Sequence, residues 1–116
     1  MPILDSEERP WGSWHVLDEG AGYKVKRIHV QPGKRLSLQS HKLRAENWTV
    51  VQGTALAQVD DTVQLLKPGG MVVIPLGARH RLSNDGPEEL IVVEVQRGPS
   101  TAEDDITRYQ DDFGRG

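Results

Sequence analysis

Closely spaced turn signals are the feature that most limits what this chain can fold into. Proline and glycine occur together at Pro32-Gly33, Pro68-Gly69-Gly70 and Pro75-Leu76-Gly77, and a fourth signal follows at Asn84-Asp85-Gly86-Pro87. Glycine favours turns because it adopts left-handed backbone angles, and proline does so because it restricts φ and lacks an N–H donor. The segments between these signals are shorter than the roughly ten residues that a typical helix needs.

The short segments between the turns have the composition of β-strands. They are rich in valine, isoleucine, leucine and threonine, which pack well on a pleated surface. About eight such strands predict a β-sandwich or barrel rather than alternating βα units. The predicted strands are Val25–Val30, Leu36–His41, Trp48–Gln52, Thr54–Val59, Val63–Leu66, Met71–Ile74, His80–Ser83 and Leu90–Gln96.

Composition narrows the possible functions. The 116 residues predict one domain, and 36% hydrophobic residues are enough for a core. The net charge of −3 gives no basic surface for nucleic acid. The chain has no cysteine, so disulfides, thiolate ligands and cysteine nucleophiles are excluded and a metal would need nitrogen and oxygen ligands. The first residues lack the apolar core of a signal peptide and no stretch is long enough to span a membrane, so we expect a cytoplasmic protein without a membrane partner.

The two ends of the chain differ from its centre. Asp5–Pro10 is polar and Ser100–Gly116 is strongly acidic. Thr101 followed by Asp104 would suit the start of a short helix, and a solvated tail is an equal alternative. The expected divisions are a barrel core of about residues 22–98 and an acidic tail of residues 99–116, within a single domain of residues 1–116.

Two of the four histidines lie in segments with a regular spacing. Residues two apart in a strand share a face, so Gln39 and His41 point to the same side. His80 has the parity of Leu82, an apolar residue expected inside the barrel. Glycines stand at the expected strand ends in both segments. The first pattern is Gly33, Gln39-Ser40-His41, Glu46 and Gly53, and the second is Gly69, Pro75-Leu76-Gly77, His80 and Asn84.

Glu46 has the parity of Trp48 and Val50, so its carboxylate is expected in the barrel interior. An unpaired carboxylate there is costly and would take up a proton. A divalent cation removes this cost, and two imidazole nitrogens with two oxygens suit Zn, Mn, Fe, Co or Ni. Four protein ligands also leave room for water or a substrate oxygen. The predicted ligands are Gln39, His41, Glu46 and His80.

A structural role is the alternative for each of these residues. A single histidine in a strand is more often a hydrogen-bonded structural residue than a ligand. Here the two patterns occur together and in order, which favours the metal site. His15 and His29 alternate with apolar neighbours and are predicted to face outward.

Further short motifs extend over nearly the whole chain, from about Arg9 to Arg115. Together with the two histidine segments, they resemble the type II mannose-6-phosphate isomerase domain of the cupin superfamily. The first segment of cupins commonly contains His-x-His, and in this chain Gln39 stands in the place of its leading histidine. The resemblance implies an all-β fold, a single double-stranded β-helix or jelly-roll-like barrel with short terminal extensions. The motifs are Arg9-Pro10-Trp11-Gly12-Ser13, Val25-Lys26-Arg27-Ile28, Leu36-Ser37-Leu38-Gln39, Arg44-Ala45-Glu46, Val50-Val51, Ile74-Pro75, His80-Arg81-Leu82, Glu94-Val95-Gln96 and Glu103-Asp104-Asp105-Ile106.

The resemblance also implies an activity. It assigns the four metal ligands to the residues that the spacing selects, with zinc as the expected ion. It implies the interconversion of mannose 6-phosphate and fructose 6-phosphate through an enediol. In that family the domain is commonly the C-terminal part of a bifunctional protein with mannose-1-phosphate guanylyltransferase activity. The glycine-rich signature of a nucleotidyltransferase is absent from this sequence, so only the isomerase activity is expected.

The sequence departs from the family at three positions. Members of the family have histidine where this chain has Lys42, Leu43 and Asn47. Leu43 has the parity of Gln39 and His41, so it is expected to line the pocket. This change leaves the identity of the substrate open.

The isomerisation also requires a base and a group that binds phosphate. Lys26 faces inward by its parity with Ile28 and is the first candidate for the base, although a lysine whose amine only reaches solvent is the alternative. Arg35, at the start of its strand, is the first candidate for phosphate. Arg44 and Arg81 match the family and are the further candidates for binding the substrate. Their parity is opposite to that of neighbouring metal ligands, so surface salt bridges are the role expected instead.

Two other functions use the same scaffold, because one fold carries many chemistries. A cupin module could bind a sugar or sugar phosphate without turnover, and the missing histidines favour this alternative. A metal-dependent dioxygenase is disfavoured by the glutamine ligand. The expected partners are a small sugar phosphate and a second copy of the chain in a homodimer, since an open sheet edge is often covered in this way.

Overall fold

Eleven antiparallel strands make up the regular structure of residues 3–113, the part of the chain that the computed structural model describes. None of these residues forms a helix, and none therefore forms one able to cross a membrane. The ends of the expected domain, including Arg115, lie outside the described residues. The strands are β1 (Asp5–Arg9), β2 (Gly12–Gly20), β3 (Tyr23–Val30), β4 (Leu38–Ser40), β5 (Ala45–Gln52), β6 (Ala55–Val59), β7 (Thr62–Leu66), β8 (Met71–Ile74), β9 (His80–Ser83), β10 (Leu90–Arg97) and β11 (Thr107–Gln110).

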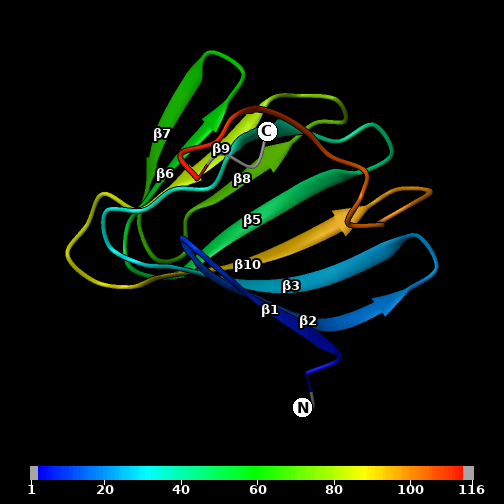
Figure 1. Cartoon of the computed structure of the whole chain (residues 1–116), viewed down its shortest axis with the longest axis horizontal. Coiled ribbons are helices and arrows are strands. Elements are labelled where there is room, and N and C mark those ends of the chain that lie inside the picture. Colours follow the sequence, from blue (N-terminus) through cyan, green and yellow to red (C-terminus); the bar gives the residue numbers. More distant parts are fainter. Residues whose placement is uncertain (1–2, 114–116) are drawn as a thin grey trace.

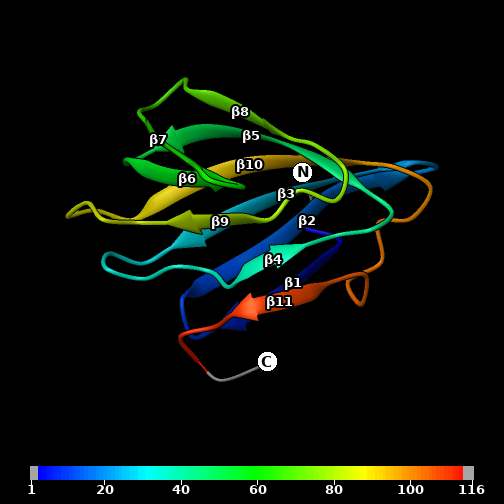
Figure 2. The same cartoon turned by 90° about the horizontal axis from the view of Figure 1, so that it is seen from above.

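The strands form two sheets of different size. The larger sheet has six strands in the order β1-β2-β3-β10-β5-β8, and those from β2 to β8 follow one another upward in Figure 1. The smaller sheet has five strands in the order β11-β4-β9-β6-β7, which run across the view in Figure 2. Strands distant in sequence are neighbours in both sheets, as in a double-stranded β-helix. The all-β prediction is confirmed.

The inner face of the larger sheet changes from apolar to polar along β3, β10 and β5. One row across these strands is apolar, with Ile28, Val92 and Val50 opposite one another. The next row pairs Lys26, Glu94 and Trp48, and the row after it pairs Lys24, Gln96 and Glu46. All of these side chains are buried. One end of the barrel is therefore a hydrophobic core, and the other end holds buried charges.

Large side chains from both sheets pack together and stabilise the apolar end of the barrel. Three tryptophans and the aliphatic residues of the inner rows are each 6% exposed or less. Burial of such side chains contributes roughly 1.5–3 kcal/mol each. The core consists of Trp11, Trp14, Val16, Ile28, Val30, Trp48, Val50, Ala55, Ala57, Ile74, Leu82, Leu90 and Val92.

The strand predictions hold for the centre of the chain and fail at its ends. Each predicted strand overlaps one of β3 to β10, although β4 is shorter than predicted because the chain turns away after Ser40. The structure adds β1 and β2 to the larger sheet and β11 to the smaller one, so the sheets extend beyond the expected core of residues 22–98. The helix considered after Thr101 is wrong, because Thr107–Gln110 pairs with β4 instead. β1 and β11 are polar and show little alternation, which explains why the sequence pattern missed them, whereas β2 does alternate around Trp14 and Val16 and was overlooked.

His15 and His29 lie on the outer face of the larger sheet, as predicted. Each is partly exposed, and the two rings make an edge-to-face contact with their centroids 5.2 Å apart. His29 also accepts a hydrogen bond from Nε of Arg27 at 2.9 Å. Neither histidine lies among the residues that line the barrel cavity.

Candidate metal centre

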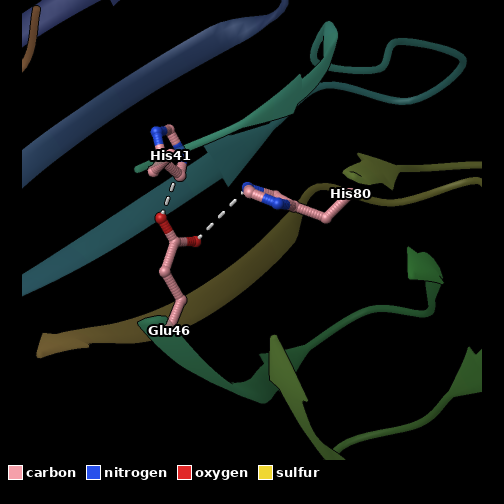
Figure 3. A group of neighbouring side chains, drawn as sticks. All are labelled: His41, Glu46 and His80. Atoms are coloured by element: carbon pink, nitrogen blue, oxygen red, sulfur yellow. Dashed lines mark ion pairs between the residues drawn. The ribbon is translucent and has the colours of Figure 1, made fainter. Parts of the chain in front are cut away.

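Three buried side chains from three segments meet at the polar end of the barrel. Glu46 lies near the start of β5, His80 begins β9, and His41 directly follows β4. Their ligand atoms all lie within 4.8 Å of one another, and the residues are only 2–3% exposed. Figure 3 shows the carboxylate of Glu46 between the two imidazoles. Nε2 of His41 is 3.2 Å from Oε2, and Nε2 of His80 is 3.7 Å from Oε1.

Backbone carbonyl groups orient both histidines. Nδ1 of His41 donates to the carbonyl oxygen of Asp105 at 2.6 Å, and Nδ1 of His80 donates to that of Ala78 at 3.1 Å. A carbonyl oxygen only accepts, so Nδ1 carries the proton in each ring and Nε2 is turned toward Glu46. Metal-binding histidines are typically held in this way by a carbonyl or carboxylate.

The electrostatics of the cluster favour the forms that bind a cation. Burial raises the pKa of Glu46, but the hydrogen bond with His41 and the charges of His80, His41 and Arg44 outweigh burial and lower the pKa below its ordinary value. Burial lowers the pKa of His80, and the neighbouring Glu46 opposes this only in part. An ionised carboxylate and a neutral imidazole are the ligand forms that metals require. The donor set therefore fits a divalent ion of the zinc type.

Arg44 contacts the same atoms of Glu46 and His41 that would bind a metal ion. Its Nε donates to Oε2 of Glu46 at 3.0 Å, and its terminal nitrogen lies 3.1 Å from Nε2 of His41. Nε2 of His41 thus faces both the guanidinium of Arg44 and the carboxylate of Glu46. A cation held by His41 and Glu46 would compete with Arg44 for these atoms, and the guanidinium would remain at the cavity wall.

Gln39, the fourth predicted ligand, lies next to the cluster. It pairs with His80 across β4 and β9 and lines the same cavity. Its amide nitrogen donates to the hydroxyl and the carbonyl oxygen of Ser37. The amide oxygen is therefore the atom that this side chain offers as a ligand.

The cluster opens into a cavity between the two sheets. Aromatic and aliphatic side chains form part of its wall, and the rest is charged. Five cationic side chains and three carboxylates face it, so the wall carries an excess of positive charge. The lining residues are Arg9, Trp11, Trp14, Lys26, Ile28, Leu36, Ser37, Gln39, Arg44, Glu46, Trp48, His80, Arg81, Leu82, Glu94, Glu103, Ile106 and Arg108.

The expectation of surface positions for Arg44 and Arg81 is wrong. Both are buried, 6% and 5% exposed, and both line the cavity. Arg44 directly precedes β5 and therefore shares the face of Glu46. The prediction compared its parity with that of His41, which lies on the other side of a loop, and so assigned Arg44 to the wrong face. Arg81 is opposite in parity to His80, but Leu36 and Gln110 cover that face of β9 and accept its hydrogen bonds.

Arg35 and Leu43 also differ from their predicted positions. Arg35 is absent from the cavity wall and donates to both carboxylate oxygens of Asp112, at 2.8 and 2.9 Å. Leu43 is 44% exposed, because β4 ends at Ser40 and the strand alternation does not continue to it. None of the three positions that depart from the family lines the cavity: Lys42, Leu43 and Asn47.

Lys26 is inside the barrel, as its parity predicts. It is 5% exposed, and its Nζ lies 2.6 Å from Oε1 of Glu103 and 4.1 Å from the ring centroid of Trp14. Glu103 also binds Lys24, at 3.2 Å. Burial raises the pKa of Glu103, but the positive charge of Lys26 and the hydrogen bonds of both lysines outweigh burial and lower it. The amine of Lys26 is therefore engaged by a carboxylate.

The acidic C-terminal segment is part of the site, which the sequence did not reveal. Glu103 and Asp105 both contact residues at the polar end of the barrel. The carboxylate of Asp105 accepts hydrogen bonds from the backbone N–H groups of Lys42 and Leu43, at 3.0 and 2.9 Å. Asp105 thus holds the loop after His41 in place through its side chain and His41 itself through its carbonyl group. The sequence left a short helix and a solvated tail as equal alternatives for this segment, and only the pairing of β11 with β4 brings it here.

Glu94 is a second residue that the sequence analysis did not select. It is 5% exposed, lines the cavity and accepts a hydrogen bond from Nε2 of Gln96 at 2.6 Å. Burial raises its pKa to about 8, with a further contribution from the charge of Glu46. Its parity with Val92 was a usable signal, because it places a carboxylate on an otherwise inward face.

The raised pKa of Glu94 predicts a pH-dependent stability in the metal-free protein. The unfolded chain loses this proton near pH 4.5 and the folded chain near pH 8. The contribution of Glu94 to stability is therefore complete below about pH 4.5 and is lost as the pH rises through about 8. We expect the free energy of unfolding of the wild type, relative to Glu94→Gln, to fall by at least about 1 kcal/mol between pH 6 and pH 9. Urea titrations at the two pH values measure it, and an unchanged difference would contradict the assignment.

Comparison with known proteins agrees with the geometry. Residues 5–111 match the family described as mannose-6-phosphate isomerase, C-terminal. The xanthan biosynthesis protein XanB of Xanthomonas campestris is 50% identical over 107 residues, which cover 92% of this chain and 23% of that protein. A mannose-1-phosphate guanylyltransferase of Escherichia coli is 47% identical over 107 residues, which cover 92% of this chain and 22% of that protein. The chain thus spans less than a quarter of the length of these relatives.

A solved structure confirms the fold. The crystal structure of an RmlC-like cupin from Shewanella frigidimarina superposes with a TM-score of 0.75 and 19% identity, covering 86% of each chain. At this identity, the likeness concerns the fold alone. The matched family and the relatives show the lineage: the chain has a cupin fold and belongs to the mannose-6-phosphate isomerase C-terminal family.

Proposed function

We propose that this domain is a metal-dependent isomerase that interconverts mannose 6-phosphate and fructose 6-phosphate. The observation that carries the proposal is the buried cluster of His41, Glu46 and His80, which opens into a cavity with an excess of cationic side chains. Membership of the family and the name of the guanylyltransferase relative support a mannose phosphate as the substrate.

The donor set supports zinc as the resident ion. Two imidazole nitrogens and a carboxylate oxygen are its usual ligands, with Gln39 as a fourth. Mn, Fe, Co or Ni would satisfy the same donors. When bound, the ion would supply Lewis-acid stabilisation of the negative charge that develops on the substrate oxygens.

The cationic wall supports an anionic substrate. Arg81 donates to the carbonyl oxygen of Leu36 and to two oxygens of Gln110. These acceptors are neutral, so the hydrogen bonds do not cancel the charge of Arg81, which can serve a phosphate group. Arg44, which lines the same cavity, adds a second guanidinium at the cluster. These two arginines are the proposed phosphate and sugar ligands, and Arg35 no longer is one.

The substitutions that distinguish this chain from its family do not argue against the isomerase. Lys42 and Leu43 are exposed in the loop after His41, and Asn47 accepts hydrogen bonds from Arg97 on the outer face of the sheet. A histidine at these positions would not line the cavity either. The non-catalytic binding module therefore loses the observation that favoured it.

A direct assay tests this function. The protein is stripped of metal, reloaded in parallel with Zn, Mn, Co, Ni and Fe(II), and assayed for fructose 6-phosphate formed from mannose 6-phosphate. We expect at least one ion to restore turnover, and the stripped protein to be inactive. Stoichiometric metal without turnover in every sample would overturn the proposal and leave a binding module.

A further inference from the structure

We propose that the carboxyl group of Glu94 carries the proton between C2 and C1 of the substrate. This inference rests on the proposed isomerase function and names the base that the reaction needs. Glu94 lies on β10, the middle strand of the three whose inner faces form the polar end of the barrel, and it lines the same cavity as the candidate ligands.

The strand register places Glu94 beside the metal centre without making it a ligand. It lies directly opposite Lys26 on β3 and Trp48 on β5, and its neighbour Gln96 lies opposite Glu46. Glu94 is thus diagonal to Glu46 on one face, at a distance that is roughly 7–8 Å between Cα atoms for such pairs. A sugar whose oxygens approach the cluster would present its carbon atoms within reach of this carboxyl group.

The other titratable groups at the cavity wall already have another role. Glu46 belongs to the ligand cluster. Glu103 binds two lysines, and Lys26 is its partner in one of those ion pairs. Among the described residues of the wall, Glu94 is the carboxyl group that is neither in the ligand cluster nor in an ion pair within 4.0 Å. The only hydrogen bond it is seen to accept comes from the neutral amide of Gln96.

The chemistry balances with this one carboxyl group. The carboxylate removes the proton from C2 of the open-chain aldose, and the electron pair of the C2–H bond becomes the second bond between C1 and C2. O1 gains a proton to give the enediol. The carboxyl group then returns its proton to C1 while O2 loses its hydroxyl proton, which gives the ketose and restores the carboxylate. The hydroxyl protons exchange with water, and no other reactant is consumed.

The environment of Glu94 suits a group that both takes and returns a proton. Burial raises its pKa to about 8 in the metal-free protein, and proton transfer is most efficient when the pKa lies near the working pH. Its neighbours across the sheet and along the strand, Trp48 and Val92, are buried, and Glu94 itself is only 5% exposed.

The test compares Glu94→Gln with two other variants, each loaded with the metal that supports wild-type activity. Glu89→Gln removes the same charge just before β10 and outside the cavity wall, and it is the matched control. Lys26→Met removes the competing base. Each protein is measured for bound metal, for affinity toward mannitol 6-phosphate, which lacks the carbonyl group and cannot react, and for deuterium uptake from D2O at the sugar carbons by NMR.

We expect Glu94→Gln to bind one metal ion, to bind mannitol 6-phosphate within threefold of the wild type, and to lose turnover and deuterium uptake by at least about 100-fold. Glu89→Gln should match the wild type, and Lys26→Met should still exchange deuterium. Exchange that survives in Glu94→Gln and disappears in Lys26→Met would show lysine to be the base. If Glu94→Gln lost metal binding or ligand binding as strongly as it lost turnover, Glu94 would have a structural role, and this result would also overturn the proposal. A metal-loaded wild type that is inactive would overturn the isomerase function, and Glu94 as its base with it.

Discussion

Replacement of His80 by alanine is expected to abolish stoichiometric metal binding and isomerase activity together. His80 is 3% exposed, and its Nδ1 is held by the carbonyl oxygen of Ala78 so that Nε2 faces Glu46. Loss of an outer hydrogen-bond partner already costs about 10–100-fold in metal affinity, so loss of the ligand should cost at least about 100-fold. Activity should fall by a similar factor or more, because the metal supplies several kcal/mol of charge stabilisation.

Elemental analysis after dialysis and calorimetric titration with Zn2+ measure this effect. His29→Ala is the matched control, since it removes an imidazole from the outer face of the same barrel. Circular dichroism of both variants shows whether the β-fold is retained. A folded His80→Ala protein that binds one equivalent of zinc with wild-type affinity would refute the proposed metal centre.

Replacement of Gly98 by alanine is expected to destabilise the protein by about 3 kcal/mol or more. A Cβ at this position would lie 2.0 Å from the carbonyl oxygen of Leu43 and 2.9 Å from Cα of Arg44. These atoms belong to the backbone, which cannot move aside as a flexible side chain can, and large losses are characteristic of such strain. The segment that must shift leads from His41 to Glu46, so metal affinity should fall as well.

Urea unfolding of the metal-free proteins measures the loss of stability, with Gly77→Ala as the control. Gly77 has φ of +80°, but an added Cβ would meet nothing within 4 Å. This control therefore carries backbone strain of about 1 kcal/mol without the steric clash. A Gly98→Ala protein as stable as Gly77→Ala would show that the loop between β4 and β5 can shift at little cost in free energy. The close approach of Gly98 to the backbone of Leu43 would then not determine the position of the loop.

The alternation of residues along single strands explains why much of the site was predictable. Glu46 shares a face with Trp48 and Val50, and all three are buried as predicted. Lys26 likewise follows Ile28 into the interior. The period of two is a local property of an extended chain, so it needs no knowledge of the partners of a strand. It fails where the strand ends, as Leu43 shows.

Positions that depend on a distant segment were not predictable in this way. Arg81 is buried because Gln110 covers it, and His41 is oriented by the carbonyl group of Asp105, 64 residues further along the chain. The acidic segment contributes Glu103 to the cavity only because β11 pairs with β4. No local pattern records such a pairing.

The sequence by itself determined the all-β class, the positions of the central strands and the residues of the candidate metal cluster, because turn chemistry and strand alternation act over a few residues. Only the tertiary structure decided what surrounds that cluster. It brought Arg44 to the ligand atoms, turned Arg35 away to Asp112, and placed Glu94 in the middle of the polar rows. The reason is physical: the face of a strand follows from its own geometry, whereas the burial and charge of that face depend on the segments that pack against it.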